Sequence, residues 1–159
     1  MKVILFRPQI PQNTGNIVRT CSVTGSELAL VEPLGFSLSD RWLKRAGLDY
    51  WEGVSVEVIR DLEAFLETSG RPFYFFSSRA ERSYHTVKYA ADAQLIFGSE
   101  TEGLPESFRK RWPERFLSLP MLEGSRCLNL ATSAGIALYE AWRQLGFGDC
   151  LADDAVQRG

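Results

Sequence analysis

The sequence predicts a single-domain α/β fold with a mainly parallel sheet flanked by helices. Short apolar runs alternate with amphipathic stretches along the chain, which is the order expected of strands joined by helices. The 159 residues are enough for one ordinary domain with a buried core. No internal repeat or low-complexity tract divides the chain, so we expect one domain over residues 1–148 and a polar tail over 149–159.

The apolar runs predict six strands, at residues 2–7, 27–31, 54–59, 73–77, 94–97 and 116–119. The stretches between them predict helices at 12–24, 40–46, 61–67, 106–112 and 129–145. Asn13 or Thr14 is suited to cap the first helix, and Gly146 to end the last. Ligands of such sheets bind in loops beyond the carboxyl ends of the strands, so we expect the functional site there.

Composition excludes several classes of protein. Hydrophobic residues make up 45% of the chain and charged residues 24%, close to the average for soluble globular proteins. The longest apolar runs are too short to cross a bilayer, and the N-terminus lacks the features of a signal peptide. We therefore expect no membrane-spanning segment and a cytoplasmic location.

The cysteines and the histidine do not form a metal-binding pattern. Cys21, Cys127 and Cys150 are an odd number without C-x-x-C spacing, which argues against a disulfide framework or a zinc site. The one histidine, His85, has no cysteine or other histidine near it in the sequence. We expect chemistry that uses no protein-bound metal.

The net charge of −2 creates no overall positive field, so any nucleic-acid partner would have to be held by local basic patches. Two runs, at 41–45 and 109–115, place a tryptophan among cations. Each tryptophan either stacks on a base or anchors a helix to the core. For either run alone, a solvated helix is the favoured interpretation.

The first unusual segment, Pro-Gln-Asn-Thr-Gly-Asn-Ile-Val-Arg at 11–19, directly follows the first strand. Gly15 allows close approach of a ligand or a neighbouring element. Arg19 follows about one turn later, near a helix N-terminus whose amides favour an anion. The segment suits a phosphate or ribose site, although an ordinary capped helix is the simpler interpretation of this segment alone.

The second segment, Leu-Ile-Phe-Gly-Ser-Glu-Thr-Glu-Gly-Leu-Pro at 95–105, runs from a strand into a polar loop. Gly98 and Gly103 expose backbone groups that can hold an adenosyl group without charged side chains. The loop lacks the Gly-Lys-Ser/Thr ending of a P-loop. Two acids in one small loop also do not provide the separated carboxylates of a glycosidase. A ligand-binding loop is the favoured interpretation.

The third segment, at 119–143, contains a polar loop followed by a helix. Apolar and small residues at helical spacing predict a core or subunit interface, at Leu130, Ala134, Ala137, Leu138, Ala141 and Leu145. Asn129, taken alone, would be a helix cap without a catalytic role. Tyr139 and Arg143 share another face of the helix.

Taken in order, the three segments closely resemble the motifs of the SPOUT RNA 2'-O-methyltransferases. The particular similarity is to the TrmL family, the compact tRNA (cytidine/uridine-2'-O)-methyltransferases of the wobble position. The matching stretches are 10–19, 32–36, 46–50, 97–105, 125–130 and 139–146. Six matches in order over a chain of this length make the resemblance specific.

The resemblance implies a sheet whose C-terminal part is threaded into a trefoil knot, one of the rare exceptions to unknotted topology. It implies that the knot forms a pocket for S-adenosylmethionine and that two copies form a homodimer around the tRNA anticodon loop. It implies no membrane, DNA or metal partner. The positions matching the family's cofactor contacts are Phe76, Ser77, Gly98, Glu100, Leu119, Cys127, Leu128, Asn129 and Ser133. At Cys127, relatives often carry serine.

The catalytic positions implied by the resemblance are Arg19, Arg126, Asn129 and Tyr139. Arg19 matches the family arginine near the reacting ribose. A guanidinium stays protonated in proteins, so we expect Arg19 to orient phosphate and stabilise the developing alkoxide rather than act as a general base. Arg126 is a candidate RNA contact and Tyr139 a support for the site or the dimer face. Glu100 is a candidate for the charge opposite the sulfonium.

The predicted activity is therefore methyl transfer from S-adenosylmethionine to the ribose 2'-hydroxyl of the wobble cytidine or uridine of tRNA. Two alternatives remain open. One is the same chemistry at another tRNA position or on rRNA, and the other is a non-catalytic RNA-binding protein with the knotted fold. A dinucleotide-binding Rossmann enzyme ranks last, because no G-x-G-x-x-G follows a strand.

Overall fold

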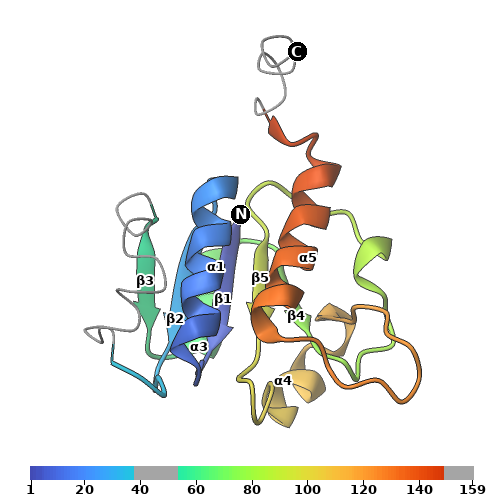
Figure 1. The fold of residues 1–159 in the computed structure, drawn as a ribbon, viewed down its shortest axis with the longest axis horizontal. Helices are drawn as coiled ribbons and strands as arrows, with labels where there is room; N and C mark the ends of the chain where they lie inside the picture. The colour runs from blue at the N-terminus through green and yellow to red at the C-terminus, as the bar shows by residue number, and fades with distance from the viewer. Residues whose placement is uncertain (38–53, 149–159) are drawn as a thin grey trace.

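The computed structural model describes residues 1–37 and 54–148. Within them the chain forms a six-stranded, entirely parallel sheet of order β3-β2-β1-β5-β4-β6 (Figure 1). The strands are β1 (Lys2–Phe6), β2 (Glu27–Val31), β3 (Val56–Ile59), β4 (Phe73–Phe76), β5 (Gln94–Phe97) and β6 (Phe116–Leu117). The predicted α/β class and parallel sheet are confirmed. The chain runs outward from β1 to β3, and the later strands lie on the other side of β1.

Helices cover both faces of the sheet, because each central strand is apolar on both sides. Val3 and Leu5 of β1 belong to a core shared with α1 (Pro11–Thr24) and α5 (Leu130–Gln144). Ile4 and Phe6 belong to a second core, shared with α3 (Leu62–Ser69) and α4 (Glu106–Arg111). Short 3-10 turns, η2 (Tyr84–Thr86) and η3 (Pro113–Arg115), complete the described elements. Strands buried on both faces are typical of three-layer α/β proteins.

The start of α1 differs from the prediction. The helix begins at Pro11, and Ile10 occupies the cap position without a side-chain hydrogen bond. Proline suits this first position because its missing N–H would have had no partner inside the helix. Asn13 and Thr14 are buried within the helix, so the prediction that one of them caps it is wrong. Both side chains are buried because they lie on the side of α1 that faces the protein interior.

The C-terminal helix agrees closely with its predicted pattern. Asn129 caps α5, and its side-chain oxygen accepts hydrogen bonds from the backbone N–H groups of Ala131 at 2.8 Å and Thr132 at 3.4 Å. The stripe facing the sheet is buried, at Ala134, Ala137, Leu138 and Ala141. Leu130 packs against that core, whereas Leu145 is 37% exposed at the helix end, so it does not belong to the core and its alternative place in a subunit interface stays a prediction. Small side chains allow α5 to pack beside α1 (Figure 1).

The second basic run, at 109–115, is anchored by its tryptophan. The Trp112 ring packs against Phe73, Phe75 and Phe108 at centroid distances of 5.5, 5.7 and 5.9 Å. This confirms the interpretation of Trp112 as a core anchor. The other basic run at 41–45, the predicted helix at 40–46, the motif stretch at 46–50 and the tail at 149–159 lie outside the described residues. The trefoil knot stays a prediction.

Among the described helices, none has the length and apolar character needed to cross a membrane.

Candidate functional site

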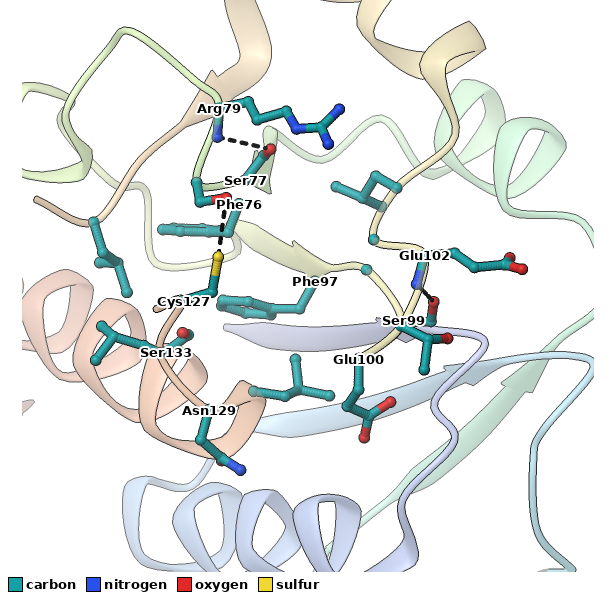
Figure 2. Close-up of a pocket in the computed structure, with 18 of the residues that line it drawn as sticks. Phe76, Ser77, Arg79, Phe97, Ser99, Glu100, Glu102, Cys127, Asn129 and Ser133 are labelled. Atoms are coloured by element: carbon teal, nitrogen blue, oxygen red, sulfur yellow. Dashed lines mark hydrogen bonds between the residues drawn. The ribbon is translucent and has the colours of Figure 1, made fainter. Parts of the chain in front are cut away.

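A cavity of about 520 Å³ opens where β4 and β5 end, at the carboxyl edge of the sheet. Its volume is typical of small-molecule pockets. Its position, beyond the carboxyl ends of the strands, is where parallel sheets bind their ligands. Its walls come from the ends of β4 and β5, the loop after β5, the segment after β6 and the start of α5 (Figure 2). All nine positions that the resemblance implied for cofactor contact line this cavity: Phe76, Ser77, Gly98, Glu100, Leu119, Cys127, Leu128, Asn129 and Ser133.

The loop after β5 is closed on itself by short hydrogen bonds. Ser99 and Gly103 exchange backbone hydrogen bonds of 3.2 and 3.0 Å, and the Ser99 hydroxyl accepts one from the Glu102 N–H at 3.1 Å. Gly103 has a φ of +70°, a conformation that favours glycine. A Cβ on Gly98 would lie 2.2 Å from the backbone carbon of Gly103. The two glycines therefore allow the tight turn that forms one wall of the cavity.

The Glu100 carboxylate ties this loop to the start of α1. It accepts hydrogen bonds from the backbone N–H groups of Gln9 at 2.8 Å and Ile10 at 3.2 Å. It also accepts one from the side-chain amide of Asn13 at 2.9 Å. An anion at a helix N-terminus is stabilising. Ile10, at the cap position of α1, makes no side-chain hydrogen bond to the helix. Glu100, from a distant part of the sequence, therefore places the negative charge at this helix end.

Asn13 continues this connection to the third segment. The Asn129 side-chain amide donates a hydrogen bond of 2.9 Å to the side-chain oxygen of Asn13. Glu100, Asn13 and Asn129 therefore form one hydrogen-bonded chain that joins the three segments singled out in the sequence. Asn13 lines the cavity, and the sequence interpretation missed this role because it treated the residue as a helix cap. The signal was a polar residue on the buried side of a helix.

Apolar side chains form the inner wall of the cavity. The Phe76 and Phe97 rings are stacked, with centroids 4.7 Å apart and planes 17° apart. Leu119 and Leu128 add aliphatic surface. At the exposed edge, the Cys127 thiol donates a hydrogen bond of 3.5 Å to the Ser78 hydroxyl (Figure 2). A wall of this kind suits a flat, largely uncharged group.

The wall at the end of β4 contains two arginines that the sequence interpretation did not place in the site. The Arg109 guanidinium donates hydrogen bonds of 3.1 Å to the Ser77 hydroxyl and 3.2 Å to the Arg79 carbonyl. Both arginines line the cavity. The predicted solvated helix therefore holds for only part of the basic run. No local sequence pattern distinguishes Arg109 from its basic neighbours.

Of the four predicted catalytic residues, only Asn129 lines the cavity. Arg19 is exposed on α1, and Arg126 is exposed in the loop before α5. Tyr139 is 45% exposed on α5, and its ring packs edge-on against Trp142 at 5.5 Å. The structure therefore does not bring Arg19, Arg126 and Tyr139 into the cavity, and their roles stay predictions. Within the described part of the chain, no three His, Cys, Asp or Glu residues form a group suited to a metal ion.

Comparison with known proteins supports the same family. The family model of the SpoU rRNA methylases matches residues 1–139. The tRNA (cytidine(34)-2'-O)-methyltransferase of Methylovorus glucosotrophus is 45% identical over 151 residues, covering 94% of this chain and 98% of that protein. A solved structure described as giving insight into 2-OH methylation of C/U34 on tRNA superposes with a TM-score of 0.85. It is 44% identical and covers 91% of this chain and 95% of that one.

A third similar protein is the AdoMet-bound rRNA methyltransferase of Sinorhizobium meliloti. Its structure superposes with a TM-score of 0.80 at 26% identity, over 91% of this chain and 56% of that larger chain. The family model covers well over half of the present chain, and the Methylovorus protein aligns over nearly its full length. The chain belongs to the SpoU rRNA methylase family.

Proposed function

We propose that this protein transfers a methyl group from S-adenosylmethionine to the ribose 2'-hydroxyl of the wobble cytidine or uridine of tRNA. The observation that carries the proposal is the meeting of all nine implied cofactor positions in one cavity. The names of the Methylovorus relative and of the C/U34 structure support the choice of tRNA and of position 34. The near-complete coverage of both proteins supports transferring that choice to this chain.

The residues of the cavity fit S-adenosylmethionine. The stacked Phe76 and Phe97 rings offer apolar surface for an adenine, and the loop between Gly98 and Gly103 offers backbone polar groups. The Ser77 hydroxyl adds a neutral hydrogen-bonding group. The AdoMet-bound structure from Sinorhizobium meliloti supports this ligand. When bound, S-adenosylmethionine supplies a strongly electrophilic methyl group on a positively charged sulfur.

The side chains then have two tasks: to hold the ribose in line with the methyl group, and to assist removal of the hydroxyl proton. Arg19, exposed on α1, holds a phosphate and stabilises the developing alkoxide while remaining protonated. Arg126, three residues before Asn129 on an exposed loop, contacts RNA. Asn129 is held in place by Asn13 and by the backbone N–H groups of Ala131 and Thr132, so its side chain is fixed where it lines the cavity.

The proposed assembly is a homodimer that receives the anticodon loop of a tRNA in the cytoplasm. An anticodon loop already exposes its nucleotides, so no base needs to be flipped from a duplex. Exposed apolar side chains on α5 support a partner face, with Ile136 38% and Tyr139 45% exposed. Light scattering after size-exclusion chromatography should give twice the 17.9 kDa chain mass. A monomer at micromolar concentration would remove the dimer from the proposal.

The activity is tested by incubating the purified protein with S-adenosylmethionine and bulk tRNA or, in a parallel reaction, rRNA, each from a strain that lacks the gene. Nucleoside mass spectrometry of the digested tRNA should show a new ribose-methylated pyrimidine. A base-methylated nucleoside would contradict the proposed chemistry. Cofactor binding without any product, on tRNA or on rRNA, would favour a non-catalytic RNA-binding protein. A product on rRNA alone would favour the alternative substrate.

A further inference from the structure

We propose that Arg109 is a positioning residue for cofactor binding and that it acts through the Ser77 hydroxyl. This inference rests on the proposed function, because it concerns the affinity of the same cavity for S-adenosylmethionine. Arg109 does not belong to any of the stretches that carry the family resemblance. The evidence is the set of contacts that its guanidinium makes at the end of β4.

The Arg109 guanidinium is held from several sides. It donates to the Ser77 hydroxyl and to the Arg79 carbonyl, and its central carbon lies 4.9 Å from the centre of the Phe116 ring. Its Nε lies 3.9 Å from a Glu106 carboxylate oxygen, and the side chain is only 30% exposed. A planar guanidinium can bridge two acceptors in a fixed geometry, which an ammonium group cannot reproduce.

These contacts determine whether the Ser77 hydroxyl can donate or accept a hydrogen bond in the cavity. A serine oxygen accepts at most two hydrogen bonds and donates one. Both acceptor positions are used, by Arg109 Nη2 at 3.1 Å and by the backbone N–H of Arg79 at 3.3 Å. The hydroxyl hydrogen is therefore left to donate. Because Ser77 lines the cavity, this hydrogen is available to an acceptor atom of a molecule bound there.

The backbone of Ser77 is fixed as well. Its N–H donates to the Leu117 carbonyl at 2.9 Å, and its carbonyl accepts from the Ala80 N–H at 3.1 Å. The side chain thus projects from an anchored position, and Arg109 fixes its remaining freedom, the direction of the hydroxyl proton. A preorganised donor binds its ligand more tightly because less ordering is needed on binding.

Helix α4 offers a matched control in Arg111. That arginine pairs with Glu63 and Glu67 of α3 and does not line the cavity. Arg109→Met and Arg111→Met make the same chemical change on the same short helix. Methionine also retains an apolar stem of similar length over the Phe116 ring. Differences between the two variants therefore report on the cavity contacts of Arg109.

The test is isothermal titration of the full chain with S-adenosylmethionine. Ser77→Ala and Arg109→Met should each raise the Kd by about five- to tenfold, the effect of one lost or misdirected hydrogen bond. In the double variant the Kd should stay within about twofold of that of Ser77→Ala alone, because Arg109 acts through the hydroxyl. Arg111→Met should bind like the unchanged protein. Arg109→Lys, which retains the charge and one donor group, should lose less affinity than Arg109→Met.

A ligand-free measurement provides a second readout. Hydrogen exchange at the Arg79 amide, which bonds to the Ser77 hydroxyl, should accelerate in Arg109→Met and not in Arg111→Met. Multiplicative losses in the double variant, or unchanged affinity in Arg109→Met, would overturn the positioning role. If the unchanged protein itself fails to bind S-adenosylmethionine, the proposed function falls and this inference falls with it.

Discussion

Replacing Glu100 by glutamine removes one charge from the centre of the hydrogen-bonded chain that joins the three sequence segments. One carboxylate oxygen accepts from Gln9, and the other accepts from Ile10 and from Asn13. Glutamine has a single acceptor oxygen, so its NH₂ group must face at least one N–H donor. The substitution therefore loses at least one charge-assisted hydrogen bond while leaving the side-chain volume nearly unchanged.

The expected cost follows from these contacts. A hydrogen bond to a charged group contributes about 1.5–3 kcal/mol, and the partly exposed setting of Glu100 favours the lower part of that range, about 2 kcal/mol. For a chain of 159 residues, each kcal/mol shifts the melting temperature by about 2–4 °C. We therefore expect Glu100→Gln to melt about 4–8 °C below the unchanged protein.

Thermal unfolding followed by circular dichroism measures this shift, with Glu102→Gln as the control. Glu102 is an exposed neighbour in the same loop, and within the described residues its carboxylate makes no hydrogen bond or ion pair. Its substitution should change the melting temperature by about 1 °C or less. Equal shifts in the two variants would refute the anchoring role of Glu100.

The same variant separates anchoring from the alternative that Glu100 faces the sulfonium charge. S-Adenosylhomocysteine lacks that charge, so an anchoring carboxylate should affect its binding as much as that of S-adenosylmethionine. We expect Glu100→Gln to weaken both ligands by the same factor, within about twofold. A loss confined to S-adenosylmethionine would show that the carboxylate acts on the sulfonium and would contradict a purely anchoring role for Glu100.

Three further substitutions or labelling experiments test other parts of the site. Arg19→Ala should reduce methyl transfer by about a hundredfold or more while the Kd for S-adenosylmethionine changes less than twofold, and equal losses would mean that Arg19 is misplaced. Gly98→Ala should abolish measurable cofactor binding in titration, because the new Cβ would lie 2.2 Å from the Gly103 backbone; retained affinity would show that the loop can open. Burial raises the pKa of the Cys21 thiol to about 12, so at pH 8 iodoacetamide should label exposed Cys127 and leave Cys21 unmodified in the folded protein. Peptide mass spectrometry locates the label, and saturating S-adenosylmethionine should protect Cys127; early labelling of Cys21 would contradict the described core.

Much of the fold is predictable because it depends on local periodicity. The apolar runs at 27–31 and 94–97 coincide with β2 and β5, and the stripe of small residues on α5 is buried as its spacing indicates. Several predicted ends differ from the observed ones by one or two residues, and at one of them a local backbone feature is the cause. The first strand stops at Phe6 because Arg7 turns into a positive φ of 50°.

The site is predictable in its positions but not in its connections. The resemblance led to nine residues that do line one cavity. It did not indicate that Glu100 reaches the backbone of Gln9 or that Asn13 meets Asn129, because these pairs are separated by 91 and 116 positions. Arg109 was also missed, since its role depends on the end of β4 lying beside α4. Such contacts are created by the sheet order and leave no mark on local spacing.

The most direct test of the central claim is methyl transfer to an anticodon stem-loop in which single riboses are replaced by 2'-deoxyribose. The purified protein, S-adenosylmethionine carrying a tritiated methyl group, and a substrate stem-loop with the wobble position 34 left intact should give labelled RNA. Removing the 2'-hydroxyl at position 34 alone should abolish labelling, whereas removing that of either adjacent nucleotide should leave most of it. Full labelling of the 34-deoxy substrate would contradict ribose methylation at the wobble position.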